Sequence, residues 1–263
     1  MNHEEVGRIW EGNAEAWTRL ARAGYDVYRD GFNTPAFVAM LPDVERLAGL
    51  DVGCGEGHNT RLLAGHGARM TGVDISPTFV RYANEAEEEH PLGIRYEVAG
   101  AANLPFEHAS FDFATAFMSL MDMPETGRVL AEVFRVLRPG GFLQFSITHP
   151  CFDTSHRKDV RGEDGLTYAV EVGDYFRKLD GEVEEWIFSA APPEVQEGLR
   201  PLRVPRFTRT LSELLNLLLD GGFVLERLGE PRPSDEMIRE QPGLQSARVV
   251  PYFLHVRARK PPE

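Results

Sequence analysis

Hydrophobic and polar positions form short apolar runs that alternate with amphipathic stretches along most of this chain. The apolar runs predict strands ending at Asp51 and over 68–76, 94–98, 111–120 and 142–148, with two more at 223–229 and 251–259. The amphipathic stretches predict helices over 59–65, 77–89, 125–137 and 211–222. Strands that alternate with helices in this way indicate an α/β fold with a doubly wound, mostly parallel sheet.

Local signals mark two helix boundaries. The motif TLSE at 210–213 has the capping-box pattern and opens the helix that follows. The motif RPGG at 138–141 is expected to end the preceding helix before the fifth strand. The last two strand-like runs are expected to follow one another in succession. In open parallel sheets ligands bind beyond the carboxyl ends of the strands, so we expect the functional residues there.

Two segments lie outside the alternation. Residues 1–35 carry an apolar helical stripe and are expected to form a lid. Residues 151–209 contain the strand-like pieces LTYAVEV and EVEEWIF and form an insertion after the fifth strand. Long insertions in compact domains are commonly lids or binding loops. Residues 36–150 would then form the ligand-binding core, which 210–263 complete with a last helix and closing strands.

The sequence LDVGCGEGHNT at 50–60 joins the first strand to a helix and has glycines at 53, 55 and 57. Glycine permits positive φ and lets a ligand approach the backbone closely. The spacing G-x-G-x-G differs from the G-x-G-x-x-G of dinucleotide enzymes. Asp51 precedes the first glycine by two residues, where it disfavours a pyrophosphate and favours a ligand with a positive group.

Charge and cysteine content exclude several classes of function. A net charge of −13 and an isoelectric point near 5.1 offer no basic surface to a nucleic acid. Cys54 and Cys151 lie far apart, so neither a zinc site nor a disulfide framework is expected. The polar start MNHEEVGRIW does not resemble a signal peptide, and no apolar run approaches the roughly 18 residues of a membrane span. We expect a cytoplasmic protein without nucleic-acid, membrane or metal partners and leave its oligomeric state open.

Four motifs occur in order between about residues 47 and 147: LDVGCGEGHNT, GVDIS, NLPFEHASFD and VFRVLRPGGFL. Together they resemble the class I S-adenosylmethionine-dependent methyltransferases. The resemblance implies a Rossmann-like fold with a seven-stranded sheet whose seventh strand is antiparallel. It also implies S-adenosyl-L-methionine as cofactor, S-adenosyl-L-homocysteine as product and a small-molecule methyl acceptor.

The resemblance implies roles for individual residues. Gly53, Gly55 and Gly57 would approach the methionine part of the cofactor, with Asp51 beneath its ammonium side. Asp74 would accept hydrogen bonds from both ribose hydroxyls, because a carboxylate has two acceptor oxygens; helix capping is the alternative. The complete set of implied cofactor contacts is Asp51, Gly53, Cys54, Gly55, Gly57, Asn59, Thr60, Asp74, Ile75, Ser76, Ala101, Ala102 and Phe117.

One departure from the family pattern concerns the adenine. Many relatives have Gly-Asp-Ala before the LPF turn, and that aspartate bonds the adenine amino group, whereas this chain has Gly100 at the corresponding position. Gly100 has no side-chain acceptor. The backbone groups of Ala101 and Ala102 are therefore expected to bond the adenine edge, with Ile75 against the ring.

Methyl transfer from a sulfonium mainly requires orientation and in some enzymes a base. Asp122 and His149 follow the ends of the fourth and fifth strands, so they are the candidate catalytic residues, with His156 as a further candidate. For each of the three, a capped turn or a structural hydrogen bond is the alternative. A thiol nucleophile at Cys151 is disfavoured, because attack on a pyrimidine does not suit an acidic protein.

Aromatic residues near the amino terminus complete the predicted acceptor site. Trp10, Trp17, Tyr25 and Tyr28 could cover a sulfonium or quaternary cation, with helix packing as the alternative. Asn13 is a polar exception on this apolar stripe. The predicted substrate and lid contacts are Trp17, Tyr25, Met121, His149 and Phe152.

Two other functions stay open from the sequence alone. One is an NAD(P)-dependent oxidoreductase, which the glycine spacing and the LRPGG motif disfavour. The other is a protein that holds S-adenosylmethionine without catalysis, which the sequence does not exclude. The identity of the methyl acceptor and of its reacting atom is not readable from these motifs.

Overall fold

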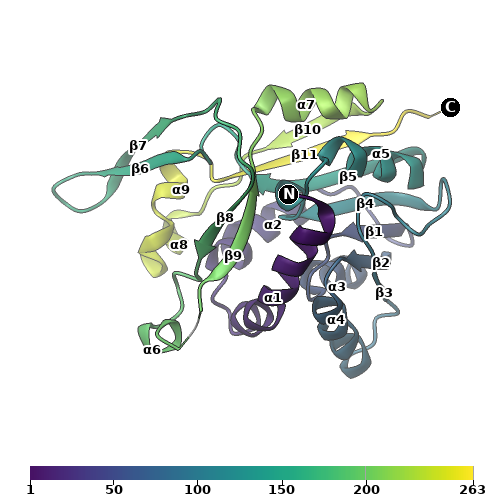
Figure 1. Ribbon diagram of the computed structural model, residues 1–263, viewed down its shortest axis with the longest axis horizontal. Coiled ribbons are helices and arrows are strands. Elements are labelled where there is room, and N and C mark those ends of the chain that lie inside the picture. Colours follow the sequence, from purple (N-terminus) through teal and green to yellow (C-terminus); the bar gives the residue numbers. More distant parts are fainter. Residues whose placement is uncertain (199, 263) are drawn as a thin grey trace.

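The computed structural model describes residues 1–198 and 200–262, which form a seven-stranded sheet with helices on both faces (Figure 1). Its strands are β1 (Ala48–Val52), β2 (Arg69–Asp74), β3 (Arg95–Val98), β4 (Phe111–Phe117), β5 (Leu137–Thr148), β10 (Val224–Gly229) and β11 (Phe253–Arg259), in the order β10-β11-β5-β4-β1-β2-β3. Strands β1 to β5 pair in parallel, whereas β11 is antiparallel to both β5 and β10. The predicted mostly parallel, doubly wound sheet with an antiparallel seventh strand is confirmed.

Helices on the two faces of the sheet bury separate apolar clusters. The main helices are α1 (His3–Arg22), α2 (Thr34–Met40), α3 (His58–Gly65), α4 (Pro77–Glu89), α5 (Thr126–Val136) and α7 (Leu211–Asp220). Leu63 of α3 and Val80 of α4 pack with Phe113, whereas Leu130 of α5 packs with Ala114. Phe113 and Ala114 are neighbours in β4, and successive strand residues point to opposite faces. Within the described residues, no helix has both the length and the apolar character needed to cross a membrane.

A side-chain cap begins α7 where the sequence predicts it. Thr210 accepts a hydrogen bond from the Glu213 N–H at 3.1 Å, and the Glu213 carboxylate accepts one from the Thr210 N–H at 2.9 Å, so the capping box is confirmed. The RPGG prediction is wrong in one respect, because α5 ends at Val136 and β5 begins at once with Leu137. Leu137 already pairs with Phe111 of β4, and the strand continues through the motif with a register shift and a φ of 79° at Gly140.

The insertion forms two hairpins rather than a layer of the main sheet. Strands β6 (His156–Arg161) and β7 (Thr167–Gly173) form one, and β8 (Asp180–Trp186) and β9 (Leu202–Phe207) form the other, with α6 (Pro193–Gln196) between β8 and β9. Figure 1 shows β6 and β7 extending away from the sheet, whereas β8 and β9 run beside α1. The predicted strand pieces LTYAVEV and EVEEWIF correspond to β7 and β8.

The carboxyl-terminal part differs from the prediction. The strands β10 and β11 are not consecutive elements, because α8 (Asp235–Glu240), the 3-10 helix η3 (Pro242–Leu244) and α9 (Ser246–Val249) lie between them. These short helices form an apolar cluster with the π-helix η1 (Arg29–Asn33), in which Leu244 and Phe32 are both buried. Their apolar residues are too few to produce a helical stripe that periodicity would detect.

Candidate active site

A cavity of about 490 Å³ lies at the carboxyl ends of β1, β2, β4 and β5 and is bounded by α1, η1 and the β8–β9 hairpin. Such a volume lies within the usual range for small-molecule sites. Twelve of the predicted site residues line it: Trp17, Tyr25, Gly53, Cys54, Gly55, Asn59, Asp74, Ile75, Ala101, Phe117, Met121 and Asp122. Seven others are not among its lining residues: Asp51, Gly57, Thr60, Ser76, Ala102, His149 and Phe152.

The three glycines of the turn after β1 all have positive φ, but for different reasons. A Cβ at Gly53 would lie 2.5 Å from the Cβ of Ser119, and one at Gly57 would lie 2.6 Å from the Tyr96 hydroxyl. A Cβ at Gly55 would meet no described atom within 4 Å. Gly53 and Gly57 are therefore required by packing within the protein, whereas Gly55 keeps the cavity wall open to a ligand.

Asp51 is an internal anchor beneath the turn rather than a residue of the cavity wall. Its buried carboxylate accepts hydrogen bonds from the hydroxyls of Thr60 at 2.6 Å and Thr115 at 2.9 Å. Burial raises the pKa of Asp51 although both hydroxyls act against the rise. Asp51 and Thr60 thus join the end of β1 to the start of α3, and any effect on a ligand is exerted through the turn that they support.

Asp74 lies at the end of β2 and faces the cavity. One carboxylate oxygen accepts the N–H of Gly55 and the other accepts the N–H of Ser76, each at 2.9 Å. Burial raises the pKa of Asp74 from 3.8 to about 6. Each oxygen keeps a second lone pair, so the side chain holds the glycine turn in place and still offers two acceptors to a ligand.

The amino-terminal helix is fastened to the rim of the cavity by a residue that the sequence did not single out. Glu11 of α1 accepts hydrogen bonds from the hydroxyls of Ser76 at 2.5 Å and Thr78 at 2.7 Å. Ser76 also caps α4 through the N–H of Phe79. Burial opposes ionisation of Glu11, but these hydrogen bonds outweigh it and lower the pKa of its carboxyl.

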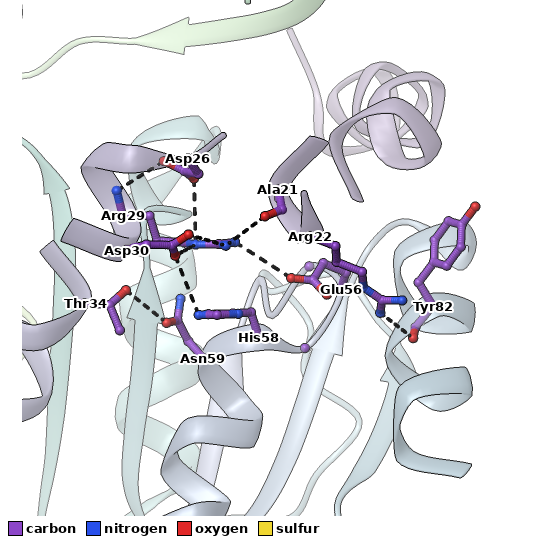
Figure 2. Close-up of polar contacts among 12 residues, drawn as sticks. Ala21, Arg22, Asp26, Arg29, Asp30, Thr34, Glu56, His58, Asn59 and Tyr82 are labelled. Atoms are coloured by element: carbon purple, nitrogen blue, oxygen red, sulfur yellow. Dashed lines mark hydrogen bonds and ion pairs between the residues drawn. The ribbon is translucent and has the colours of Figure 1, made fainter. Parts of the chain in front are cut away.

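Figure 2 shows a second fastening, in which two arginines from the amino-terminal segment approach the glycine turn. Arg22 pairs with Glu56 at 2.9 Å, and Arg29 lies 3.8 Å from the same carboxylate. Arg29 also pairs with Asp30 at 2.7 Å, and Asp30 lies 3.8 Å from the imidazole of His58. Glu56 is only 7% exposed. A glutamate between two glycines of the turn is the sequence feature that could have indicated this cluster, although the predicted site residues did not include it.

Asp122 ends the 3-10 helix η2 (Leu120–Asp122) beyond β4, where its carboxyl is 6% exposed and lines the cavity. Among the described residues no hydrogen-bond donor pairs with this carboxyl, and the nearby Arg206 is bound by Asp153 at 2.6 Å. Burial raises the pKa of Asp122 from 3.8 to about 8, with Arg206 lowering it and Asp153 raising it. A carboxyl with a pKa this high carries a proton through part of the neutral range and can exchange it with a ligand.

Comparison with known proteins places this geometry in a family. Residues 50–145 match the family model described as a methyltransferase domain. A solved S-adenosylmethionine-dependent methyltransferase from Mesorhizobium loti is 30% identical, with a TM-score of 0.69 over 86% of this chain and 96% of that one. The chain belongs to the class I S-adenosylmethionine-dependent methyltransferases.

Curated relatives support methylation of small molecules by this methyltransferase. It is 34% identical over 192 residues to the O-methyltransferase cnsE of Penicillium expansum, covering 69% of this chain and 67% of that protein. It is also 36% identical over 97 residues to the ubiquinone biosynthesis O-methyltransferase of Coxiella burnetii, which covers 37% of this chain and 42% of that protein. These relatives give no support to the oxidoreductase alternative.

The position of His149 in the methyltransferase does not support a role at the acceptor. Its Nε2 lies 3.0 Å from Glu230, and its Nδ1 accepts the N–H of Cys151 at 3.2 Å. Phe152 packs against the imidazole with ring centroids 5.0 Å apart, and neither residue lines the cavity. The chain turns after β5, where the N–H of Phe152 bonds the carbonyl of His149 at 2.9 Å. Thr148 and Pro150 therefore line the cavity, whereas the side chains of His149 and Phe152 do not. His156 is an exposed residue of β6 that pairs with Glu171 at 2.9 Å.

The aromatic residues of α1 line the cavity and also pack on the insertion. Trp17 stacks on Trp186 of β8 with centroids 5.2 Å apart and contacts Phe188 edge-on at 5.0 Å. Asn13 forms a two-way pair with the backbone of Arg203 in β9, its amide donating at 2.6 Å and its oxygen accepting at 3.0 Å. Asn13, the polar residue on the apolar stripe of α1, thus attaches this helix to strand β9 of the hairpin.

Proposed function

We propose that the methyltransferase binds S-adenosylmethionine along the carboxyl ends of β1 and β2 and methylates a hydroxyl oxygen of a largely apolar small molecule held against Asp122. The observation that carries the proposal is the buried Asp122 carboxyl, which faces the cavity without a hydrogen-bond donor among the described residues. The curated relatives cnsE and the ubiquinone enzyme are both named O-methyltransferases.

The cofactor end of the cavity has donor and acceptor groups that fit this ligand. Asp74 has two oxygens that each retain an acceptor site for a ribose hydroxyl. The missing side chain of Gly55 leaves room for the backbone to be approached. Ile75 and Ala101 line the cavity beside Asp74 and provide an apolar surface for adenine. When bound, S-adenosylmethionine supplies an electrophilic methyl group on its sulfonium.

The other end of the cavity has the features needed to hold and deprotonate a hydroxyl. Asp122 in its ionised form accepts the hydroxyl hydrogen bond and takes the proton as the oxygen becomes alkylated. The rings of Trp17, Phe117 and Tyr252 line the same cavity and give it an apolar wall. The protein then contributes mainly orientation, because the transfer is an in-line displacement that requires close alignment of two reacting atoms.

The proposal is tested by two measurements on the wild-type protein. Calorimetry should show binding of S-adenosylhomocysteine and no binding of NADH. Transfer of a labelled methyl group should then be measured on matched aromatic acceptors that carry a hydroxyl, an amino or a thiol group. Methylation of the amine or thiol members with no product from the hydroxyl members would overturn the oxygen assignment, and failure to bind S-adenosylhomocysteine would overturn the cofactor assignment.

A further inference from the structure

Three arginines line the cavity, and they differ in what neutralises them. Arg29 lies among the carboxylates of Asp26, Asp30 and Glu56. Arg206 has two carboxylate partners, Asp153 at 2.6 Å and Glu184 at 3.4 Å. Arg209 forms no ion pair with a carboxylate of the described residues. Its only hydrogen bond to a described residue is from Nη1 to the carbonyl of Phe207, at 3.4 Å.

The carboxylates nearest to Arg209 in the fold are committed elsewhere or too far away. Glu213 accepts the N–H of Thr210 at 2.9 Å and pairs with Lys178 at 2.5 Å. Asp180 and Glu213 attract the Arg209 guanidinium from a distance, but among the described residues no carboxylate oxygen lies within 4.0 Å of it. Burial therefore dominates and lowers the pKa of Arg209, whereas the paired Arg206 has a raised pKa.

A partly buried guanidinium without a counter-charge is unfavourable for the protein by itself. Arginine does not escape the problem by losing its proton at any ordinary pH, because its pKa stays far above neutrality. Buried charges in proteins are accordingly paired or hydrogen-bonded. Arg209 is half-buried and lines the cavity, so a ligand in the cavity is placed to supply the missing partner.

The backbone on both sides of Arg209 is held in place. The N–H of Thr208 bonds the carbonyl of Leu179 at 3.1 Å, and the Thr208 hydroxyl bonds the carbonyl of Arg177 at 3.0 Å. Thr210 on the other side is the cap of α7. The guanidinium is thus carried by a fixed stem between β9 and α7, on the side of the insertion rather than on the glycine turn.

We propose that Arg209 binds an anionic group of the methyl acceptor, a carboxylate, so that the substrates of this enzyme are small hydroxy acids. The planar fork of a guanidinium matches the two oxygens of a carboxylate. Asp122 and Arg209 line one cavity, so a single molecule presents its hydroxyl to the first and its acid group to the second. This inference rests on the proposed function. The carboxylate of the cofactor is assigned to the glycine turn at the other end of the cavity, whereas Arg209 lies on the insertion side between β9 and α7.

The experiment compares hydroxybenzoates and hydroxycinnamates with their carboxamides, which keep the shape and the hydroxyl but lose the charge. Binding to the protein saturated with S-adenosylhomocysteine is measured by calorimetry and by the shift in unfolding temperature. Arg209→Gln is compared with Arg203→Gln, a charge-matched control at an exposed position of the preceding strand β9. Arg209→Lys is the second variant, which keeps the charge if the first does not fold.

The proposal predicts that wild type and Arg203→Gln prefer the acids, and that Arg209→Gln loses roughly tenfold to a hundredfold in affinity for acids with no loss for amides. Arg209→Gln should be at least as stable as wild type without ligand, since it removes an uncompensated charge. A wild type that does not prefer acids, or an Arg209→Gln variant with clearly reduced stability and an unchanged preference, overturns the proposal. Failure to bind S-adenosylhomocysteine would instead count against the proposed function, and it is measured first.

Discussion

Arg22 in the last turn of α1 and Glu56 in the glycine turn form an ion pair at 2.9 Å across 34 residues of sequence. The pair joins the amino-terminal segment directly to the glycine turn, which lines the proposed cofactor end of the cavity. Glu56 is nearly buried and Arg22 is partly exposed, so the contact lies at the edge of the protein interior. The position of α1 and the conformation of the glycine turn are therefore coupled by a contact that a single substitution can remove.

Glu56→Gln should loosen the contact between the amino-terminal segment and the glycine turn. The neutral amide keeps the shape but loses the attraction to Arg22 and Arg29, so we expect the free energy of unfolding to fall by about 1 kcal/mol. Proteolysis in the turn after α1 should become faster, because the segment is released more often. Glu85→Gln is the control, since Glu85 forms an exposed pair with Arg81 within α4. Equal cleavage rates in wild type and both variants would show that the ion pair does not hold the amino-terminal segment in place.

Asp74→Ala should weaken binding of S-adenosylhomocysteine by about 2 kcal/mol, roughly thirtyfold, because the ribose hydroxyls lose a charged acceptor. Calorimetry on the folded variant measures the change. Part of this loss of affinity comes from the glycine turn, because the Gly55 N–H loses its hydrogen bond to Asp74 in the variant. Asp74→Asn helps to separate the two contributions, since the amide oxygen still accepts one hydrogen bond. A dissociation constant equal to that of wild type in both variants would limit Asp74 to a structural role.

Cofactor affinity should depend on pH through Asp74. Burial raises the pKa of this carboxyl from 3.8 to about 6 in the protein without ligand, and the ionised form is the better acceptor of hydroxyl hydrogen bonds. Affinity for S-adenosylhomocysteine should therefore be full at pH 7 and about tenfold weaker at pH 5. The same titration with Asp74→Asn should be flat over this range. If the affinity of Asp74→Asn for S-adenosylhomocysteine still falls between pH 7 and pH 5, the pH dependence comes from a group other than Asp74.

Asp122→Asn should lower kcat on the order of a hundredfold, because the variant has no base for the acceptor hydroxyl. In wild type, kcat should rise with pH until Asp122 is ionised, and the pKa of about 8 puts that rise near pH 8. Asp220→Asn, at the exposed end of α7, is the control for loss of one negative charge. A variant that retains the wild-type rate would remove Asp122 from the chemistry.

Stability provides an independent test of the Asp122 environment. Its folded pKa of about 8 exceeds the ordinary 3.8, so between these values the folded protein holds a proton that the unfolded chain has lost. The contribution of this group to stability is therefore full below pH 3.8 and decreases as pH rises to 8, by up to about 1.4 kcal/mol per pH unit. Asp122→Asn removes this pH dependence. The free energy of unfolding of the variant, measured in urea, should therefore exceed that of wild type by an amount that grows from pH 5 to pH 8.

His149→Gln should affect the fold more than the reaction. The imidazole contacts Glu230 and the Cys151 N–H outside the cavity, and we expect the free energy of unfolding to fall by about 1 kcal/mol. The value of kcat on any responding acceptor should stay within about threefold of wild type. A hundredfold loss of kcat in a variant of unchanged stability would return His149 to the acceptor site.

The sequence by itself determined the alternation of strands and helices from β1 to β5, the capped start of α7 and the glycine turn. These features depend only on residues that are close in sequence. The Thr210 cap contacts Glu213, three residues ahead, and the positive φ at Gly55 favours glycine whatever packs around it. The same local information placed Asp74 and Asp122 correctly at strand ends that face the cavity. It failed at Leu137, because pairing with Phe111 extended β5 through a motif that locally favours a break.

The tertiary structure alone decided which side chains meet. Glu11 and Ser76 are 65 residues apart, and Asn13 and Arg203 are 190 apart, so no local pattern connects them. It also decided that His149 packs outside the cavity while Arg209 lines it, since a turn of a few residues reorients a side chain without changing the sequence signal. Whether a charge is compensated depends on every group within a few ångströms, and that environment exists only after distant segments have folded together.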